Sequence, residues 1–189
     1  MPKPYDVRSL QQLQMLALPV RTEIVETVSC LGPCSVGDVA RLLGAKRPAI
    51  HFHMRKLVRV GLLIEAGTRG EGRKRETLYR TPGFPIYVIY DRDDPQKVAI
   101  TSMYVRNMLA RSQRLLAQSF ESGKFTTNGP LRDTYATQLT AWLSGDDLIE
   151  LNRLLEKLTE LLRPSEAIEG KKLHCLTLGL SPLHPKEDQ

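Results

Sequence analysis

The sequence predicts a mainly α (α+β) protein, in which a helical N-terminal domain carries a two-stranded ribbon and a helical region follows. Three observations favour this class. Apolar residues recur every three or four positions in several segments, and a Gly-rich basic run separates two short β-favouring segments. Apolar residues make up 41% of the 189 positions, which is enough for a core. We place the N-terminal domain at residues 1–82 and the second region at residues 83–189.

Positive charge is concentrated between residues 44 and 80, which hold ten Lys or Arg against three Glu, a balance of +7. The whole chain has a net charge of +6, so the remainder is nearly neutral. Residues 91–189, for example, hold 13 Lys or Arg and 14 Asp or Glu. A basic segment beside neutral surroundings favours a polyanionic partner, and we expect that partner to be double-stranded DNA.

A helix is predicted over residues 47–59. Gly44 suits the position just after the preceding helix, and Pro48 suits a first helical turn. The apolar residues at helical spacing, which mark the buried face, are Ile50, Met54, Leu57 and Val58. The residues predicted to contact DNA from this helix are Lys46, Arg47, His51, Phe52 and Arg55. We expect Arg47, His51 and Phe52 to read bases in the major groove, while Lys46 and Arg55 contact phosphates. The alternative is that His51, Phe52 and the neighbouring His53 are ordinary surface or half-buried residues.

The ribbon is predicted to follow this helix directly. Residues 62–64 form one expected strand and residues 77–80 the other. The segment 67–75 between them contains glycines, which permit tight turns, and cations. The cations predicted to contact phosphates are Arg69, Arg73, Lys74 and Arg75. A purely solvated basic loop is the alternative, but its position beside a basic helix favours the DNA contact.

These residues carry a family resemblance over residues 18–80, about a third of the chain. The matching positions are Leu18-Pro19-Val20-Arg21, Ile24-Val25, Ser35-Val36, Val39-Ala40, Leu42-Leu43-Gly44, Ile50, His53-Met54, Leu57 and Gly61-Leu62. They resemble the winged helix-turn-helix repressors of the ArsR type, including larger relatives with an added C-terminal helical region. The resemblance implies a winged helix-turn-helix domain, a homodimer and a two-fold symmetric, palindromic operator.

The chain also departs from that family. Where the family usually has small hydroxyl residues at the start of the recognition helix, this chain has Lys46, Arg47 and Pro48, followed by His51 and Phe52. The base sequence that the family reads therefore cannot be carried over. The Cys-x-Cys of many metal-sensing members is missing from residues 36–43, so that sensing site is absent.

Three cysteines, Cys30, Cys34 and Cys175, form no disulfide framework. Reduced thiols, the lack of a long apolar run and the lack of a secretion signal favour a cytoplasmic protein with no membrane contact. No set of ligands has metal-binding spacing, so we expect no metal site. A thiol-based metal- or redox-sensing repressor stays open as an alternative.

The second region is predicted to contain a helix over residues 96–121, a helix that starts at Ser144 and a strand over residues 171–183. Ser144 and Asp147 have the spacing of a capping box. The apolar residues expected to build a dimer interface are Val105, Leu109, Leu116, Leu148, Leu151, Leu155, Leu158 and Leu162. A core-only role for these residues is the alternative. Nothing in this region identifies a small-molecule effector.

The sequence thus favours a dimeric, sequence-specific DNA-binding transcription regulator. The alternative from another class is a winged-helix protein-interaction module that binds an acidic partner. An enzyme is not expected, because no catalytic set and no phosphate-binding loop occurs. For the same reason we expect no catalytic residues and no cofactor.

Overall fold

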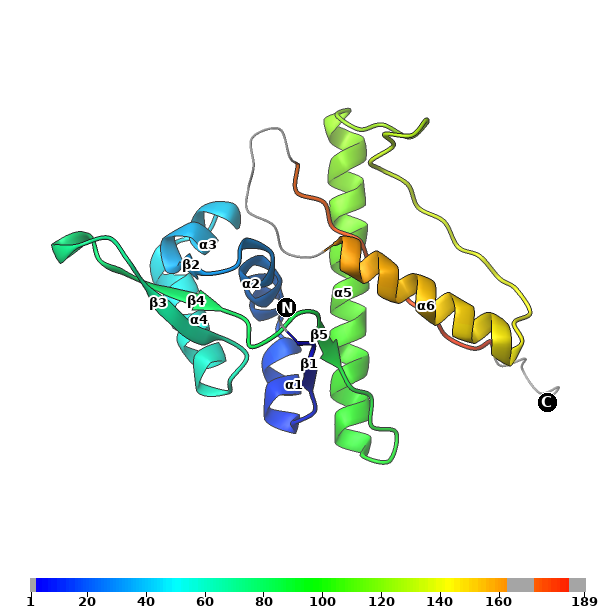
Figure 1. Cartoon of the computed structure of the whole chain (residues 1–189), viewed down its shortest axis with the longest axis horizontal. Coiled ribbons are helices and arrows are strands. Elements are labelled where there is room, and N and C mark those ends of the chain that lie inside the picture. The colour runs from blue at the N-terminus through cyan, green and yellow to red at the C-terminus, as the bar shows by residue number, and fades with distance from the viewer. Residues whose placement is uncertain (1–2, 163–171, 184–189) are drawn as a thin grey trace. The chain divides into compact units, whose positions relative to one another are not determined.

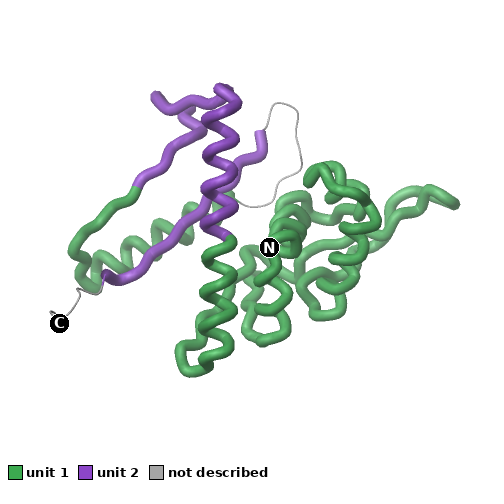
Figure 2. The backbone as a smooth tube through the Cα atoms, turned by 180° about the vertical axis from the view of Figure 1, so that it is seen from behind, with its two compact units in different colours: residues 1–107, 138–171 green, residues 108–137, 172–189 purple. Residues whose placement is uncertain are grey.

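A computed structural model describes residues 3–162 and 172–183 of the chain (Figure 1). The chain divides into two compact units (Figure 2). The first contains Met1–Asn107 and Gln138–Lys171, and the second contains Met108–Thr137 and Lys172–Gln189. The sequence boundary between residues 82 and 83 stays a prediction.

Four helices build the core of the first unit. They are α1 (Leu10–Leu16), α2 (Pro19–Leu31), α3 (Val36–Leu42) and α4 (Arg47–Arg59). Each has one apolar face, and these faces enclose a single buried cluster. The largest side chains in that cluster that are less than 2% exposed are Leu13, Ile24, Ile50, Met54, Leu57, Leu62 and Leu63. The predicted buried stripe of α4 is confirmed at Ile50, Met54 and Leu57.

A three-stranded antiparallel sheet completes the domain, with the order β2-β4-β3. The strands are β2 (Cys34–Ser35), β3 (Ile64–Arg69) and β4 (Glu76–Arg80). β3 and β4 form a ribbon that extends away from the helices, and its tip contains the 3₁₀ turn η1 (Gly72–Lys74) (Figure 1). Helices α3 and α4 with this ribbon make a winged helix-turn-helix fold, so the predicted fold class is confirmed.

Glycine closes both α3 and α4 in the same way. Gly44 has φ 60° and follows α3, as predicted, and Gly61 has φ 73° and follows α4. After α4, the amide of Gly61 donates to the carbonyl of Val58 and the amide of Leu62 donates to that of Leu57, both at 3.0 Å. This pair of bonds is the Schellman arrangement, in which a left-handed residue satisfies the last carbonyls of a helix. The chain can therefore leave α4 at once and enter the wing.

The strand predicted at residues 62–64 is wrong in its start. Leu62 and Leu63 are both fully buried and precede the strand, which begins at Ile64 and runs to Arg69. The Schellman turn explains the difference, because it holds the amide of Leu62 against α4 and removes it from the sheet. Toward the tip of the wing the strands extend further than predicted, because β3 continues to Arg69 and β4 begins at Glu76.

Strand β1 (Tyr5–Val7) was not expected from the sequence. It pairs in parallel with β5 (Ile86–Val88), which lies within the segment that follows the wing. Helix α5 (Pro95–Ser122) begins soon afterwards, and its residues Ile100 and Tyr104 pack against the core. The Asn107 side-chain amide also donates to the carbonyl of Ala17 at 2.8 Å. The packed core thus extends well beyond the wing.

The helix predicted over residues 96–121 is confirmed by α5. The strand predicted over residues 171–183 is wrong for residues 172–183, which form no strand, and residue 171 lies outside the described residues. In the second unit, Ser112 of α5 and Thr177 share a hydrogen bond between their hydroxyl groups. A helix satisfies its own backbone groups and offers no edge for pairing. Residues 172–183 therefore have an alternating pattern but no strand partner among the described residues.

Helix α6 (Gly145–Leu161) confirms the predicted capping box. The amide of Ser144 donates to Asp147 Oδ2 at 2.8 Å, and the amide of Asp147 donates to Ser144 Oγ at 3.2 Å. None of the residues of α6 is buried: Leu148, Leu154 and Leu161 are exposed, while Leu151, Leu155 and Leu158 are half-buried. The apolar side chains of α6 are thus only partly covered by the described residues.

Candidate nucleic-acid interface

The exposed face of α4 is basic and carries one large aromatic ring. Burial of Ile50, Met54 and Leu57 turns the opposite arc of the helix to solvent. The residues on that arc line a shallow depression of about 270 Å³ and are Pro48, His51, Phe52, Arg55, Lys56 and Arg59. Three of the residues predicted from the sequence, His51, Phe52 and Arg55, are thus brought together on one surface.

Phe52 is 55% exposed, which is unusual for a phenylalanine on a helix that packs a core. The Lys56 ammonium lies 4.3 Å from the centre of its ring, so the ring face holds a cation in place. The His53 ring meets Phe52 edge-on, with centroids 5.3 Å apart. These contacts fix the orientation of Phe52 on the outer surface of α4.

Lys56 and Arg59 extend this surface beyond the residues predicted to contact DNA. Neither was assigned a role from the sequence. Lys56 follows Phe52 by four residues and Arg59 follows Arg55 by four, and this helical spacing could have placed both on the same face.

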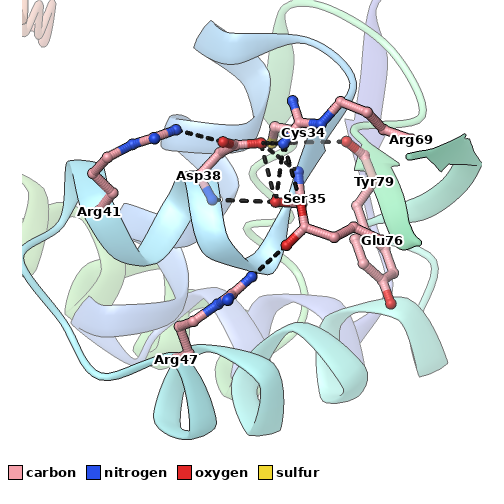
Figure 3. Close-up of polar contacts among 8 residues, drawn as sticks. All are labelled: Cys34, Ser35, Asp38, Arg41, Arg47, Arg69, Glu76 and Tyr79. Carbon is pink, nitrogen blue, oxygen red and sulfur yellow. Dashed lines mark hydrogen bonds and ion pairs between the residues drawn. The ribbon is translucent and has the colours of Figure 1, made fainter. Parts of the chain in front are cut away.

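A cluster of ion pairs ties the wing to both helices of the helix-turn-helix (Figure 3). Arg69 of β3 donates to Asp38 of α3 at 2.7 Å and to Glu76 of β4 at 3.2 Å. Glu76 also accepts a hydrogen bond from Arg47 at the start of α4. Four residues from four elements therefore share one network, which we call the carboxylate clamp: Asp38, Arg47, Arg69 and Glu76.

Asp38 has a second role within α3. Its Oδ2 accepts from the amide of Ser35 at 3.0 Å, while Ser35 Oγ accepts from the amide of Asp38 at 3.3 Å. This reciprocal pair is a capping box, with Asp in place of the usual Glu or Gln. The same carboxylate thus starts α3 and holds Arg69.

The clamp lowers the pKa values of its two carboxyl groups. Burial alone would raise the pKa of Asp38, but hydrogen bonds from Ser35 and Arg69 outweigh it and the pKa falls below its usual 3.8. Hydrogen bonds from Arg69, above all, lower the pKa of Glu76 below 4.5. Both groups are therefore ionised at neutral pH, and each can hold an arginine.

The predicted contact residues thus fall into two sets. Arg47 and Arg69 are engaged with carboxylates in the clamp, although both keep exposed guanidinium groups. Arg73, Lys74 and Arg75 lie exposed at the wing tip, and Lys46 is the exposed N-cap residue of α4. Sequence reasoning missed Asp38 and Glu76. The spacing of Ser35 and Asp38 could have identified the cap, but nothing local pairs Asp38 with Arg69, 31 residues away.

The cysteines are not gathered into a site. Cys34 is a buried residue of β2, and burial raises the pKa of its thiol to about 12, with Asp38 adding to the effect. Such a thiol stays protonated at neutral pH and reacts poorly. Cys30 is half-buried and Cys175 is exposed. In the part of the chain that the structure describes, no group of three or more His, Cys, Asp or Glu could hold a metal ion.

Within residues 3–162 and 172–183, no helix is both long enough and apolar enough to span a membrane.

Residues 16–65 match the model of a family described as a helix-turn-helix domain. This segment runs from the end of α1 to the first residues of β3, and it contains the whole of α3 and α4. The chain carries a winged helix-turn-helix domain. Domains of this kind are the DNA-binding modules of transcription regulators.

No curated protein matches the chain. Several solved structures are similar to it at low identity. A Staphylococcus aureus MarR in complex with salicylate and kanamycin is 11% identical, with a TM-score of 0.30, covering 76% of this chain and 71% of that one. The multiple antibiotic-resistance repressor of Listeria monocytogenes is 14% identical, with a TM-score of 0.31 and 80% of each chain covered. The E. coli MarR apo form is 13% identical, with a TM-score of 0.31, covering 78% and 87%.

The clamp predicts a specific loss of stability in acid. A carboxyl group whose pKa is lowered by folding stabilises the protein above its unfolded pKa, and this stabilisation is lost as pH falls through the folded pKa. For Asp38 the loss therefore lies below pH 3.8. Asp38→Asn should lower the free energy of unfolding by about 1–2 kcal/mol at pH 7. In this variant the free energy of unfolding should also decrease less as the pH falls below 3.8.

Chemical denaturation of both proteins between pH 2 and pH 7 measures this effect. Asp93→Asn is the matched control, because Asp93 is almost fully exposed and its partner Arg92 lies 3.7 Å away. The control should follow the unmodified protein at every pH. If the free energy of unfolding of Asp38→Asn decreased in acid as steeply as that of the unmodified protein, the ion pairs of Asp38 would not contribute to folding.

Proposed function

We propose that the protein is a dimeric, sequence-specific DNA-binding transcription regulator of the ArsR type. The observation that carries this proposal is the outward face of α4, where Phe52 and a set of cations lie exposed on a helix of the helix-turn-helix. A helix of this size fits the major groove of DNA. The ArsR assignment rests on the spaced residues between Leu18 and Arg80 that resemble that family.

In this proposal α4, residues 47–59, is the recognition helix. His51 and Phe52 contact base edges, and the Phe52 ring suits the methyl group of thymine. Arg55 contacts phosphate, as does Lys46. Arg47 is held by Glu76 in the free protein, so its contact with a base requires an exchange of one partner for another.

The wing, residues 67–75, supplies contacts that do not depend on base sequence. Arg73, Lys74 and Arg75 extend from its tip, and in the described residues none of the three is in an ion pair. They are free to bind phosphates without giving up an existing partner. Arg69 lies deeper in the ribbon, and the clamp sets the position from which it could join them.

Two copies of the chain are needed to read a site of useful length. One recognition helix covers only a few base pairs, whereas a two-fold dimer places two such helices about one helical turn apart, or a multiple of that. The exposed leucines of α6, Leu148, Leu154 and Leu161, support this assembly, because a second copy could cover them. The operator is accordingly palindromic.

Phe52 is expected to carry sequence discrimination. Phe52→Ala should reduce the preference for the cognate site over random DNA by roughly 1–3 kcal/mol per half-site, the usual value of one base contact. Competition binding with labelled cognate DNA and unlabelled random DNA measures the preference. Tyr90→Ala, which removes another exposed aromatic ring outside the domain's basic segment, should leave it unchanged. Equal preference in Phe52→Ala and the unmodified protein would remove Phe52 from base reading.

The wing tip is expected to act through charge alone. Replacing Arg73, Lys74 and Arg75 together by Ala should weaken cognate and random DNA alike. It should also reduce the slope of log affinity against log salt by roughly 0.9 for each lost phosphate contact. Mobility shift at several salt concentrations gives that slope.

A control variant with Lys3, Arg8 and Arg92 replaced by Ala removes the same formal charge from positions outside residues 44–80. It should keep the slope close to that of the unmodified protein. If both triple variants had the same slope, the wing tip would not lie on DNA. An acidic protein partner bound more tightly than duplex DNA would favour the protein-interaction alternative.

A further inference from the structure

The segment 135–143, YATQLTAWL, has the apolar spacing of a helix but forms none in the structure. Its large apolar residues are Tyr135, Leu139, Trp142 and Leu143, which are spaced i, i+4, i+7 and i+8 and would lie on one helical face. All four are exposed, with Leu139 at 87% and Trp142 at 100%. An exposed apolar stripe of this kind indicates a cover that the described residues do not supply.

Hydrogen bonds order the chain on either side of this segment. Before it, Asp133 Oδ1 accepts from the amide of Thr126 at 2.7 Å, and the amide of Thr134 donates to the carbonyl of Thr126 at 3.2 Å. After it, Ser144 caps α6 with Asp147. Residues 135–143 thus lie between these two sets of hydrogen bonds, within the stretch between α5 and α6 that has no helix or strand.

Helix formation in this segment fails for a physical reason. Nine residues are too few for a helix that stands alone in water, because nucleation costs more than a short run of hydrogen bonds returns. Thr137 and Thr140 are β-branched and lower the helix propensity further. A helix here becomes stable only when its apolar face is packed, since packing supplies most helical stability in proteins.

The chemistry of the segment favours a second copy of this chain as the cover. At a two-fold axis, a patch on one protomer faces the same patch on its partner, so like charges in that patch would repel one another. Residues 135–143 contain no charged side chain. They also lead directly into α6, none of whose residues is buried.

The available area fits a dimer as well. Large aromatic side chains bury roughly 150–250 Å² each, so Tyr135, Trp142 and the two leucines offer several hundred Å² together. A stable interface needs about 800 Å² from each partner. The leucines of α6 can supply the remainder, and the two surfaces are continuous along the chain.

We propose that residues 135–143 fold into a helix when a second copy of the chain covers them, so that dimer formation and local folding are one event. This inference rests on the proposed dimer and goes beyond it, because it assigns the interface to a segment that has no regular structure in the single chain. The face carrying Leu139 and Trp142 packs against the partner, and Thr137 lies on the opposite face.

The test uses Trp142, which is the only tryptophan of the chain. The full-length protein is diluted from high micromolar to low nanomolar concentration, and its oligomeric state, tryptophan emission and far-ultraviolet circular dichroism are followed in parallel. Emission should shift to shorter wavelength and helical signal should increase as dimers form. Leu139→Asp should weaken the dimer by roughly tenfold or more, because each protomer loses a buried leucine. Thr137→Asp, which adds the same charge to the opposite face, should leave the dimer and the emission shift nearly unchanged.

The contrary outcomes separate the two proposals. A protein that stays monomeric at every concentration would overturn the dimer and this inference together. A dimer with unchanged Trp142 emission, or one that Leu139→Asp and Thr137→Asp affect equally, would overturn the inference alone. A shift in emission without added helical signal would likewise overturn it, since the segment would then be covered without folding as a helix.

Discussion

The arrangement of the whole domain depends on the burial of one face of α4. Ile50, Met54 and Leu57 are at most 1% exposed, and a helix that buries this stripe must present the opposite arc to solvent. That arc carries Phe52 and the cations around it. The Schellman turn at Gly61 then leads the chain directly into the wing, so the basic helix and the basic ribbon belong to one packed unit.

The carboxylate clamp joins α4 and the wing a second time, through Arg69 and Glu76, at the end nearest the start of α4. The more exposed pairs of Arg47 and Arg69 with Glu76 contribute little to stability and act mainly on geometry, whereas Asp38 also stabilises α3 through its capping box.

The two halves of the chain have opposite surface chemistry, and this contrast organises the proposed function. The N-terminal domain has a well-buried apolar core and an excess of positive charge. This charge favours a polyanionic partner. The second half is nearly neutral and exposes apolar side chains along α6 and along residues 135–143. A charged face can remain in water, but a long apolar stripe is stable only when covered. In a dimer bound to DNA, the DNA contacts the basic surface and the second copy of the chain covers the apolar surface. A single assembly therefore accounts for both surfaces.

Features set by neighbouring residues could be predicted from the sequence, and features set by distant ones could not. The limits of α4, the closing role of Gly44 and the capping box of Ser144 depend on contacts within a few positions, and the structure confirms them. Strand β1 pairs with a strand about 80 residues later, and Asp38 of α3 meets Arg69 of β3 with the whole of α4 between them in the sequence, so no local pattern reveals either. Residues 172–183 show the converse case. Their alternation predicted a strand, yet a strand also requires a partner edge, and in the described residues they have none.

The most direct test of the account is the selection of binding sites from random duplex DNA by the purified full-length protein. The account predicts enrichment of a two-fold symmetric sequence whose half-site centres lie about 10 base pairs apart, or a multiple of that spacing. Such a result would place two copies of α4 in successive major grooves. Recovery of random sequences only, with binding that salt abolishes for all of them alike, would contradict sequence-specific recognition by a dimer.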